Sequence, residues 1–187
     1  MNHFNNFFNN KKILVTGHTG FKGSWLCSWL NALGAEVTGF SLNPNTQPNM
    51  FSACNIGNDV NSIIADIRDY SAIEKTLIDN KPEIIFHLAA QPLVLESYAF
   101  PLDTFQTNIM GTANVLEAIR LRGKDFVKSV VIVTSDKCYE NLEQELGYKE
   151  SDPMGGHDPY SNSKACAELI SQSYYDSILS KAIESPF

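Results

Sequence analysis

Tyr160 and Lys164 are the two side chains whose types and spacing most directly suggest chemistry. Residues four apart lie on the same face of a helix, which would place the phenol beside the ammonium. A free tyrosine has a pKa of about 10 and is a poor base at neutral pH, but a neighbouring cation favours its phenolate form. A phenolate held in this way can remove the proton of a hydroxyl group. Because this spacing is common by chance, the interpretation depends on the elements around it.

A polar group, Thr134-Ser135-Asp136-Lys137, follows a run of apolar residues. Residues 127–134 are rich in valine and predict a buried strand. In open α/β sheets, ligands bind outside the carboxyl ends of strands, so Ser135, Asp136 and Lys137 would face a ligand. The alternative is a solvated strand end without a catalytic role.

The glycines of the first fifty residues include a G-x-x-G-x-x-G group between a predicted strand, residues 12–16, and a predicted helix. Glycines permit a tight turn and let the backbone approach a pyrophosphate, and the helix N-terminus adds free amide groups and a positive dipole end. The alternative is an ordinary glycine-rich turn, which would not need the flanking strand and helix. The pattern predicts a dinucleotide site, with the candidate residues Gly17, Thr19, Gly20, Phe21, Lys22 and Gly23.

The end of the second predicted strand, residues 36–42, bears on the choice of cofactor. Enzymes that use NAD commonly place Asp or Glu there to bind the ribose hydroxyls, and an Arg nearby accommodates the 2′-phosphate of NADP. This chain has Gly39-Phe40-Ser41-Leu42, with neither residue type. Ser41 could make one hydrogen bond to the ribose, and the sequence leaves NAD and NADP open.

Strands and helices mostly alternate along the chain. Nearly continuous apolar strands between amphipathic helices indicate a parallel sheet covered on both faces, and right-handed crossovers then give an α/β doubly wound, Rossmann-type fold. The aromatic stripe of the first helix, Phe21, Trp25 and Trp29, is expected to belong to the core. The predicted strands cover residues 12–16, 36–42, 62–66, 83–89 and 127–134. The predicted helices cover residues 21–33, 70–80, 103–122 and 160–181, and residues 43–58 and 141–158 are expected to be loops.

The composition argues against several classes of protein. A net charge of −7 disfavours a nucleic-acid partner, whose phosphates would need Lys and Arg. No apolar run reaches the roughly 20 residues of a membrane span. Residues 1–10 lack the features of a signal peptide and are expected to be a flexible leader before a single domain, residues 11–187. We expect reduced thiols in a cytoplasmic protein and no metal, because no zinc-type spacing joins Cys27, Cys54, Cys138 and Cys166.

The glycine spacing together with Tyr160 and Lys164 resembles the extended short-chain dehydrogenase/reductase superfamily. The resemblance implies a nicotinamide cofactor, whose ribose Lys164 would hold while Tyr160 takes a proton from the substrate. Asp66 and the backbone amide of Ile67 would bind the adenine, although acids at this point can also serve a helix N-terminus. Ser135 would bond the C4 oxygen of a sugar. The cofactor would pass close to the backbone at Leu88, Ala89 and Ala90.

Longer stretches resemble the family of sugar-nucleotide 4,6-dehydratases that act on CDP-glucose. The stretches are residues 17–26, 87–94, 107–112, 135–141 and 152–168. The implied reaction oxidises C4 with Tyr160 as base, eliminates water across C5 and C6 with Asp136 as acid, and returns the hydride to C6. The implied product is CDP-4-keto-6-deoxyglucose, a precursor of sugars in surface polysaccharide.

Two residues depart from the pattern of that family and its relatives. Lys137 stands where other dehydratases have a Glu that takes the C5 proton. Lys137 would be the C5 base or would position it. Because an ammonium cannot accept a proton, the role of base requires the neutral form. Leu95 stands where the CDP-glucose enzymes often have Arg, which weakens the assignment of the substrate.

The resemblance also implies more protein than this chain contains. The family is about twice as long, so we expect the substrate domain to be missing and the fragment to be inactive alone. Relatives suggest a homodimer formed through a pair of helices. Two alternatives stay open: a sugar-nucleotide epimerase of the same superfamily, and a non-catalytic dinucleotide-binding fragment.

Overall fold

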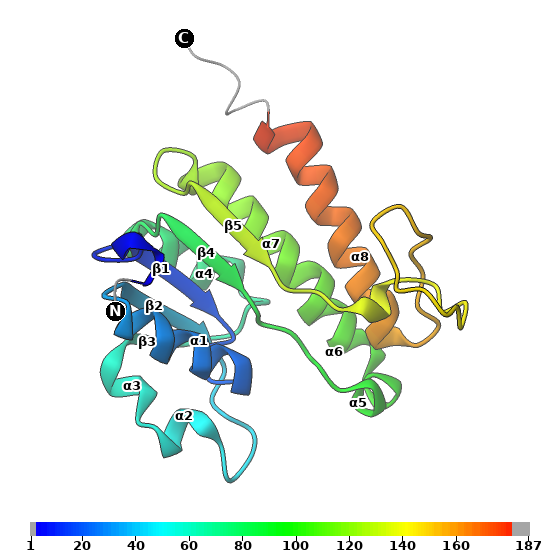
Figure 1. The fold of residues 1–187 in the computed structure, drawn as a ribbon, viewed down its shortest axis with the longest axis horizontal. Helices are drawn as coiled ribbons and strands as arrows, with labels where there is room; N and C mark the ends of the chain where they lie inside the picture. Colours follow the sequence, from blue (N-terminus) through cyan, green and yellow to red (C-terminus); the bar gives the residue numbers. More distant parts are fainter. Residues whose placement is uncertain (1–2, 181–187) are drawn as a thin grey trace.

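A five-stranded parallel sheet forms the centre of the computed structural model, which describes residues 3–180 (Figure 1). The strand order is β3-β2-β1-β4-β5, and each neighbouring pair is parallel. The order changes direction between β1 and β4, which is the point where doubly wound sheets bind nucleotides. The predicted fold class is confirmed. The strands are β1 (Lys12–Thr16), β2 (Glu36–Ser41), β3 (Asn61–Ile64), β4 (Ile84–His87) and β5 (Ser129–Ile132).

Helices cover both faces of the sheet (Figure 1). One face carries α1 (Phe21–Ala32), α2 (Met50–Ala53) and α3 (Ile56–Asp59), and the other carries α4 (Tyr70–Asn80), α7 (Gly111–Ala118) and α8 (Pro159–Tyr174). Side chains alternate between the two faces along a strand. In β1, Ile13 and Val15 therefore join the apolar cluster under α1, whereas Leu14 joins the cluster under α4 and α7.

The connection from β4 to β5 contains more helix than the sequence predicts. The short helix α5 (Val94–Ala99) is an addition, and the next helix begins at Pro101, a residue favoured in the first helical turn, rather than at 103. This long helix consists of α6 (Pro101–Phe105), a π-helical turn at Gln106–Met110, α7 and a second π-helical turn at Ile119–Gly123. It lies beside α8 (Figure 1).

The expectation that the aromatic stripe of α1 belongs to the core is wrong. Phe21, Trp25 and Trp29 are 72%, 58% and 54% exposed, respectively. Gly23, Ser24, Cys27 and Leu30 are the buried residues of α1. Two stripes of this helix have helical spacing, and the one with smaller side chains faces the sheet because the helix begins in close contact with the glycine loop. Trp29 instead contacts the ring of Phe4, at a centroid distance of 5.8 Å.

Other boundaries shift by a few residues. The predicted loop 43–58 contains the short helices α2 and α3, and β3 and β5 each end two residues before their predicted ends. The last helix continues from α8 as a π-helical turn at Tyr175–Leu179, and its predicted end at Lys181 lies outside the described residues. Between residues 3 and 180, no helix has the length and hydropathy to cross a membrane.

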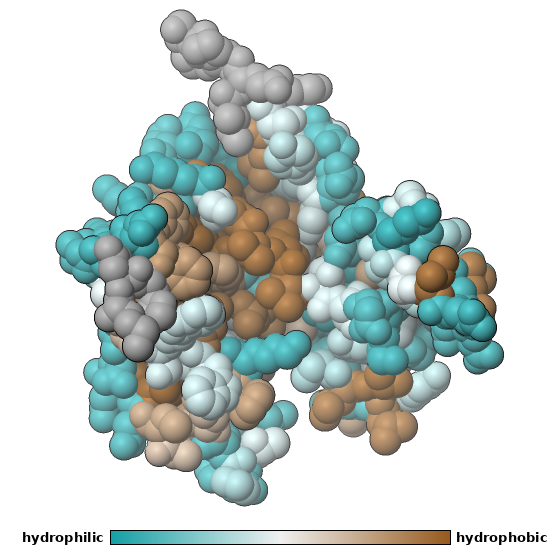
Figure 2. All heavy atoms as spheres, viewed as in Figure 1, coloured by the Kyte–Doolittle hydropathy of each residue, from teal (hydrophilic) through white to brown (hydrophobic). Residues whose placement is uncertain are grey.

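One apolar area lies at the centre of the face shown in Figure 2, over β4 and β5. Figure 1 shows no described helix in front of these two strands. Val131 of β5 is 42% exposed, and it pairs in register with the half-buried Phe86 of β4. Parallel sheets are usually covered on both faces. The β4–β5 part of the sheet is therefore covered on one face only by the described residues.

Candidate active site

The glycine loop connects β1 to α1 and makes two close backbone approaches, one to the segment after β4 and one within the loop itself. Gly17 has a φ of +76°, and a Cβ atom there would lie 2.8 Å from the backbone nitrogen of Ala89. A Cβ on Gly23 would lie 2.1 Å from the carbonyl oxygen of Gly17. No side chain caps the start of α1 at Gly20, so the amides of its first turn are left for a ligand. The loop therefore has the shape and free donors that a pyrophosphate requires.

Thr19 and Ser41 are joined at the end of β2. Thr19 Oγ1 lies 2.8 Å from the carbonyl oxygen of Leu42, to which it donates, and 3.0 Å from Ser41 Oγ. Since a hydroxyl has one hydrogen, Ser41 must be the donor to Thr19. The Thr19 side chain therefore braces the loop, and Ser41 offers only acceptor lone pairs to a ribose.

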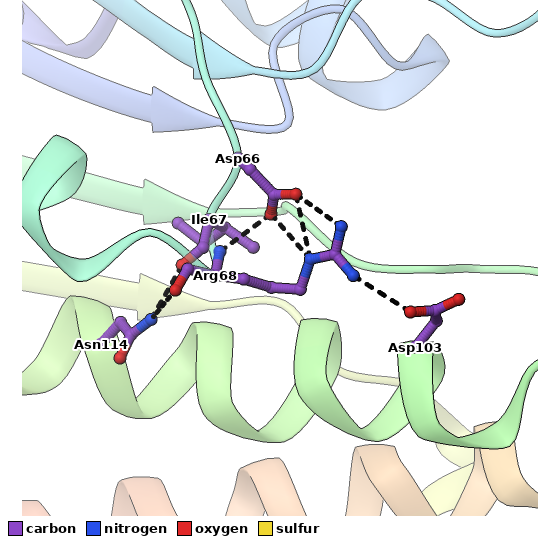
Figure 3. Close-up of polar contacts among 5 residues, drawn as sticks. All are labelled: Asp66, Ile67, Arg68, Asp103 and Asn114. Atoms are coloured by element: carbon purple, nitrogen blue, oxygen red, sulfur yellow. Dashed lines mark hydrogen bonds and ion pairs between the residues drawn. The ribbon is translucent and has the colours of Figure 1, made fainter.

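Asp66 follows β3 and is held by Arg68 (Figure 3). Asp66 Oδ1 accepts from the Arg68 backbone nitrogen at 2.9 Å, and Asp66 Oδ2 accepts from Arg68 Nη2 at 2.6 Å. The Arg68 side chain bonded to it lowers the pKa of the Asp66 carboxyl, against a smaller opposing effect of burial. Asp66 is thus ionised at neutral pH and acts as an acceptor, the role expected toward an adenine amino group.

A buried hydrogen-bond chain crosses from β1 to the helix behind the sheet. Thr16 Oγ1 accepts from the amides of Leu88 and Ala89, each at 3.1 Å, so its hydrogen points to His87 Nδ1 at 2.7 Å. His87 Nε2 then donates to Thr112 Oγ1 at 3.1 Å, because the Thr112 hydroxyl donates to the carbonyl of Asn108. Burial, and secondarily the Lys164 ammonium, lowers the pKa of His87 to about 3. His87 is a neutral imidazole that fixes the residues after β4.

Two buried histidines make stability depend on pH. The pKa of His18 is lowered by burial to about 4, and that of His87 to about 3. As the pH falls from about 6.5 to 5, the unfolded chain takes up protons at these two positions and the folded chain does not. We expect the free energy of unfolding, measured with urea, to be lower at pH 5 than at pH 7.5. The exposed His157 serves as control, since His157→Gln should leave this difference unchanged; equal stability at both pH values would contradict the prediction.

The helix α8 presents Tyr160 and Lys164 at the carboxyl edge of the sheet. Its start is fixed by Asp158, whose Oδ1 accepts from the amide of Ser161 at 3.0 Å, and the amide of Tyr160 donates to Ser97 Oγ at 3.2 Å. Asn108 Nδ2 donates at 2.8 Å to Ser163, which in turn donates to the carbonyl of Tyr160. Tyr160 is thus held from three elements, α5, the π-helical turn at 106–110 and α8 itself.

Lys164 is 7% exposed, and its Nζ donates to the carbonyl of Val133 at 3.3 Å. Burial, followed by repulsion from Lys22 of the glycine loop, lowers the pKa of Lys164 to about 8, and Glu168 opposes this shift. The Lys164 ammonium therefore lies within electrostatic reach of Lys22 in the glycine loop.

Ser135, Asp136 and Lys137 form the turn after β5. Ser135 Oγ accepts from the Lys137 amide at 3.2 Å and donates to Asp136 Oδ1 at 3.1 Å, and the side chains of Asp136 and Lys137 are exposed. The adjacent Thr134 donates to Glu168, which links the turn to α8. Among the described residues, no hydrogen bond joins the Tyr160 hydroxyl to this turn.

Three residues that the sequence did not identify support the segments that carry the predicted site residues. His87, Asn108 and Glu168 each hold a segment that carries a predicted site residue. The sequence signal for His87 and Asn108 is a polar residue at an otherwise buried position of a strand end or a helix face. Their partners lie too far along the chain to be identified from spacing.

Comparison with known proteins gives one family. The family model described as GDP-mannose 4,6 dehydratase matches residues 14–185. A CDP-glucose 4,6-dehydratase of Salmonella typhimurium is 49% identical over 95% of this chain and 49% of its own length. A GDP-mannose 4,6-dehydratase of Vibrio cholerae is 33% identical over 89% of this chain and 46% of its own. The chain spans about half the length of the curated relatives it matches.

Solved structures with this fold include UDP-glucose 4-epimerases. The Thermotoga maritima enzyme, solved with UDP-glucose, has a TM-score of 0.77 and 26% identity over 89% of this chain and 52% of its own. The Thermus thermophilus enzyme, solved with NAD, has a TM-score of 0.75 and 31% identity over 89% of this chain and 51% of its own. From the family model and the curated relatives together, the chain belongs to the GDP-mannose 4,6-dehydratase family of nucleotide-sugar enzymes.

Proposed function

We propose that this chain is the cofactor-binding half of a dehydratase that converts CDP-glucose to CDP-4-keto-6-deoxyglucose. The observation that carries the proposal is the buried Lys164, held on α8 beside Tyr160 and within electrostatic reach of the glycine loop. A buried lysine with a lowered pKa at a sheet edge is costly for stability and typical of a functional site. The similarity to the Salmonella typhimurium enzyme supports the substrate.

The residues present fit a nicotinamide dinucleotide. Gly17 and Gly23 allow close backbone approaches that a Cβ would block, which gives the loop its tight shape, and the amides at the start of α1 can bind a pyrophosphate. Asp66 and Ile67 would bind the adenine, Leu88, Ala89 and Ala90 would line the path of the cofactor, and Lys164 would hold the second ribose. Because Ser41 can only accept, it suits a ribose hydroxyl better than a phosphate, which favours NAD over NADP.

The proposed chemistry assigns the proton transfers to Tyr160, Asp136 and Lys137. When bound, the cofactor supplies a hydride acceptor and later a hydride donor. Tyr160, as phenolate, takes the proton of the C4 hydroxyl, and Ser135 bonds the C4 oxygen. Asp136 gives a proton to the C6 hydroxyl that leaves as water. Lys137, in its neutral form, takes the proton from C5 and returns it to C5 at the end of the reaction, when a hydride is delivered to C6. The exposure of Asp136 and Lys137 leaves both side chains able to meet a substrate.

A second candidate is a sugar-nucleotide 4-epimerase, which the solved UDP-glucose 4-epimerases of the same fold favour. Such a reaction needs the Tyr160–Lys164 pair but no acid for elimination of water. Asp136 followed by Lys137 therefore favours the dehydratase, and a 4-keto-6-deoxy product would distinguish the two.

The homodimer through a helix pair stays a prediction, for which the exposed Leu102 of α6 and Leu169 of α8 offer apolar surface.

Titration calorimetry with NAD, NADP and CDP-glucose tests the binding part of this proposal. We expect NAD to bind this chain more tightly than NADP, because Ser41 has no free hydrogen for a phosphate. Titration with CDP-glucose shows separately whether the residues of this chain hold the sugar nucleotide by themselves. A folded chain that binds neither dinucleotide would contradict the cofactor assignment, and tighter binding of NADP would contradict the role of Ser41.

A further inference from the structure

The loop between β3 and α4 is fastened to the long helix α6–α7 by side chains that the proposed mechanism does not use (Figure 3). We propose that Asn114 is a positioning residue that, together with Gly111 and Asp103, sets the purine selectivity of this loop. The inference rests on the proposed function, in which Asp66 and the amide of Ile67 bind adenine. In this inference, the helix α6–α7 orients these two groups toward the adenine.

Asn114 fixes the backbone next to Ile67. Its Nδ2 donates to the carbonyl oxygen of Ile67 at 3.0 Å and to that of Arg68 at 3.1 Å, so one side-chain amide orients two successive peptide units (Figure 3). An amide nitrogen carries two hydrogens, and both are used here. Only a donor with this geometry at position 114 can satisfy both carbonyls.

The Ile67 side chain is fixed from the same helix. Ile67 is 5% exposed, and a Cβ on Gly111 would lie 2.8 Å from Ile67 Cγ2. The isoleucine therefore lies directly on the glycine, one turn before Asn114. With its side chain seated and the following peptide held, Ile67 has little freedom to redirect its own N–H group.

Asp66 is held by a second fastening. Arg68 binds Asp66 through Nε and Nη2, and its Nη1 donates to Asp103 Oδ1 of α6 at 3.1 Å. The guanidinium is a planar fork, so anchoring one end at Asp103 orients the end that meets Asp66. The Asp66 carboxylate, which is the acceptor, and the Ile67 N–H, which is the donor, are thus both positioned by the long helix α6–α7.

This arrangement is complementary to one purine edge. Adenine presents an amino donor beside the N1 acceptor, which match the Asp66 carboxylate and the Ile67 N–H. Hypoxanthine presents a carbonyl acceptor beside an N1–H donor, which mismatch both groups. Because each mismatch leaves a polar group unpaired, we expect the chain to prefer ADP over IDP by about tenfold or more.

Calorimetric titration of this chain with ADP and with IDP tests the inference. Asn114→Asp keeps the size of the side chain and removes both donors. The ratio of the affinities for ADP and IDP should therefore fall toward one, while the affinity for IDP changes little. A merely structural defect would weaken both nucleotides equally. The matched control is Asn31→Asp, an exposed amide on α1 with the same change of charge, which should keep the preference.

Gly111→Ala provides an independent variant, since it displaces Ile67 without adding charge, and it should also reduce the preference for ADP. Thermal unfolding verifies that each variant is folded. If wild type prefers ADP and both variants keep that preference, the role of Asn114 is overturned and the adenine assignment stands. If wild type does not distinguish ADP from IDP, the adenine assignment and the inference are both overturned.

Discussion

Replacing Tyr160 by phenylalanine is expected to lower the rate of CDP-glucose dehydration by about 10²–10⁴-fold, the usual contribution of a positioned acid or base. The substitution removes the one oxygen proposed to take the C4 proton. The backbone contacts that hold residue 160, from its amide to Ser97 and from Ser163 to its carbonyl, do not involve the phenol and should persist. Binding of NAD should therefore change little while turnover is lost.

The measurement needs a complete sugar-nucleotide site. A chimera in which this chain replaces the matching half of the Salmonella typhimurium relative supplies one, since the two are 49% identical over this region. Tyr175→Phe is the matched control, because Tyr175 is 58% exposed beyond the end of α8. Formation of the keto sugar at an undiminished rate by the Tyr160→Phe chimera would rule out Tyr160 as the base. If the chimera is inactive before Tyr160 is replaced, either the two halves do not assemble into a working site or the proposed reaction is wrong.

Local signals in the sequence predicted much of the fold. Helix α4 has the predicted bounds, because Asp69 caps its first turn by accepting from the amide of Ala72 and Lys81 ends it in a left-handed conformation. The glycine loop was predicted because its flanking strand and helix lie within twenty residues of it. In both cases, the residues that determine the structure are neighbours in the chain.

Features that depend on distant contacts could not be predicted in this way. The sequence of α1 contains two stripes with helical spacing, and the aromatic stripe has the larger side chains. The buried stripe is decided by the approach of Gly23 to the Gly17 backbone, which requires the folded loop. Likewise, Asn108 meets a partner 55 residues away on α8, and His87 meets one 71 residues away on β1. The sequence suggests candidate site residues by their type and spacing, but not the side chains that hold them.

Gly23→Ala is expected to destabilise the chain and abolish dinucleotide binding. A Cβ at this position would lie 2.1 Å from the carbonyl oxygen of Gly17 and 2.8 Å from the Cα of His18, and both are backbone atoms that move only if the loop changes shape. Alanine is a better helix former than glycine by about 1 kcal/mol, which opposes the effect. Overpacking costs of about 1–3 kcal/mol arise where side chains can adjust, so a contact with backbone should exceed the helix gain.

Thermal unfolding and titration with NAD measure the two consequences of Gly23→Ala separately. A net loss of about 2 kcal/mol would lower the melting temperature by roughly 4–8 °C in a chain of this size. Gly147→Ala is the matched control, because no atom lies within 4 Å of the added methyl group, and it should unfold at or slightly above the wild-type temperature. If Gly23→Ala unfolds at the wild-type melting temperature and still binds NAD, the close approach of α1 to the loop is not required. Loss of NAD binding with little loss of stability would instead show that the position of the loop backbone matters chiefly for the ligand, since the pyrophosphate would rest on the same peptide groups that the methyl displaces.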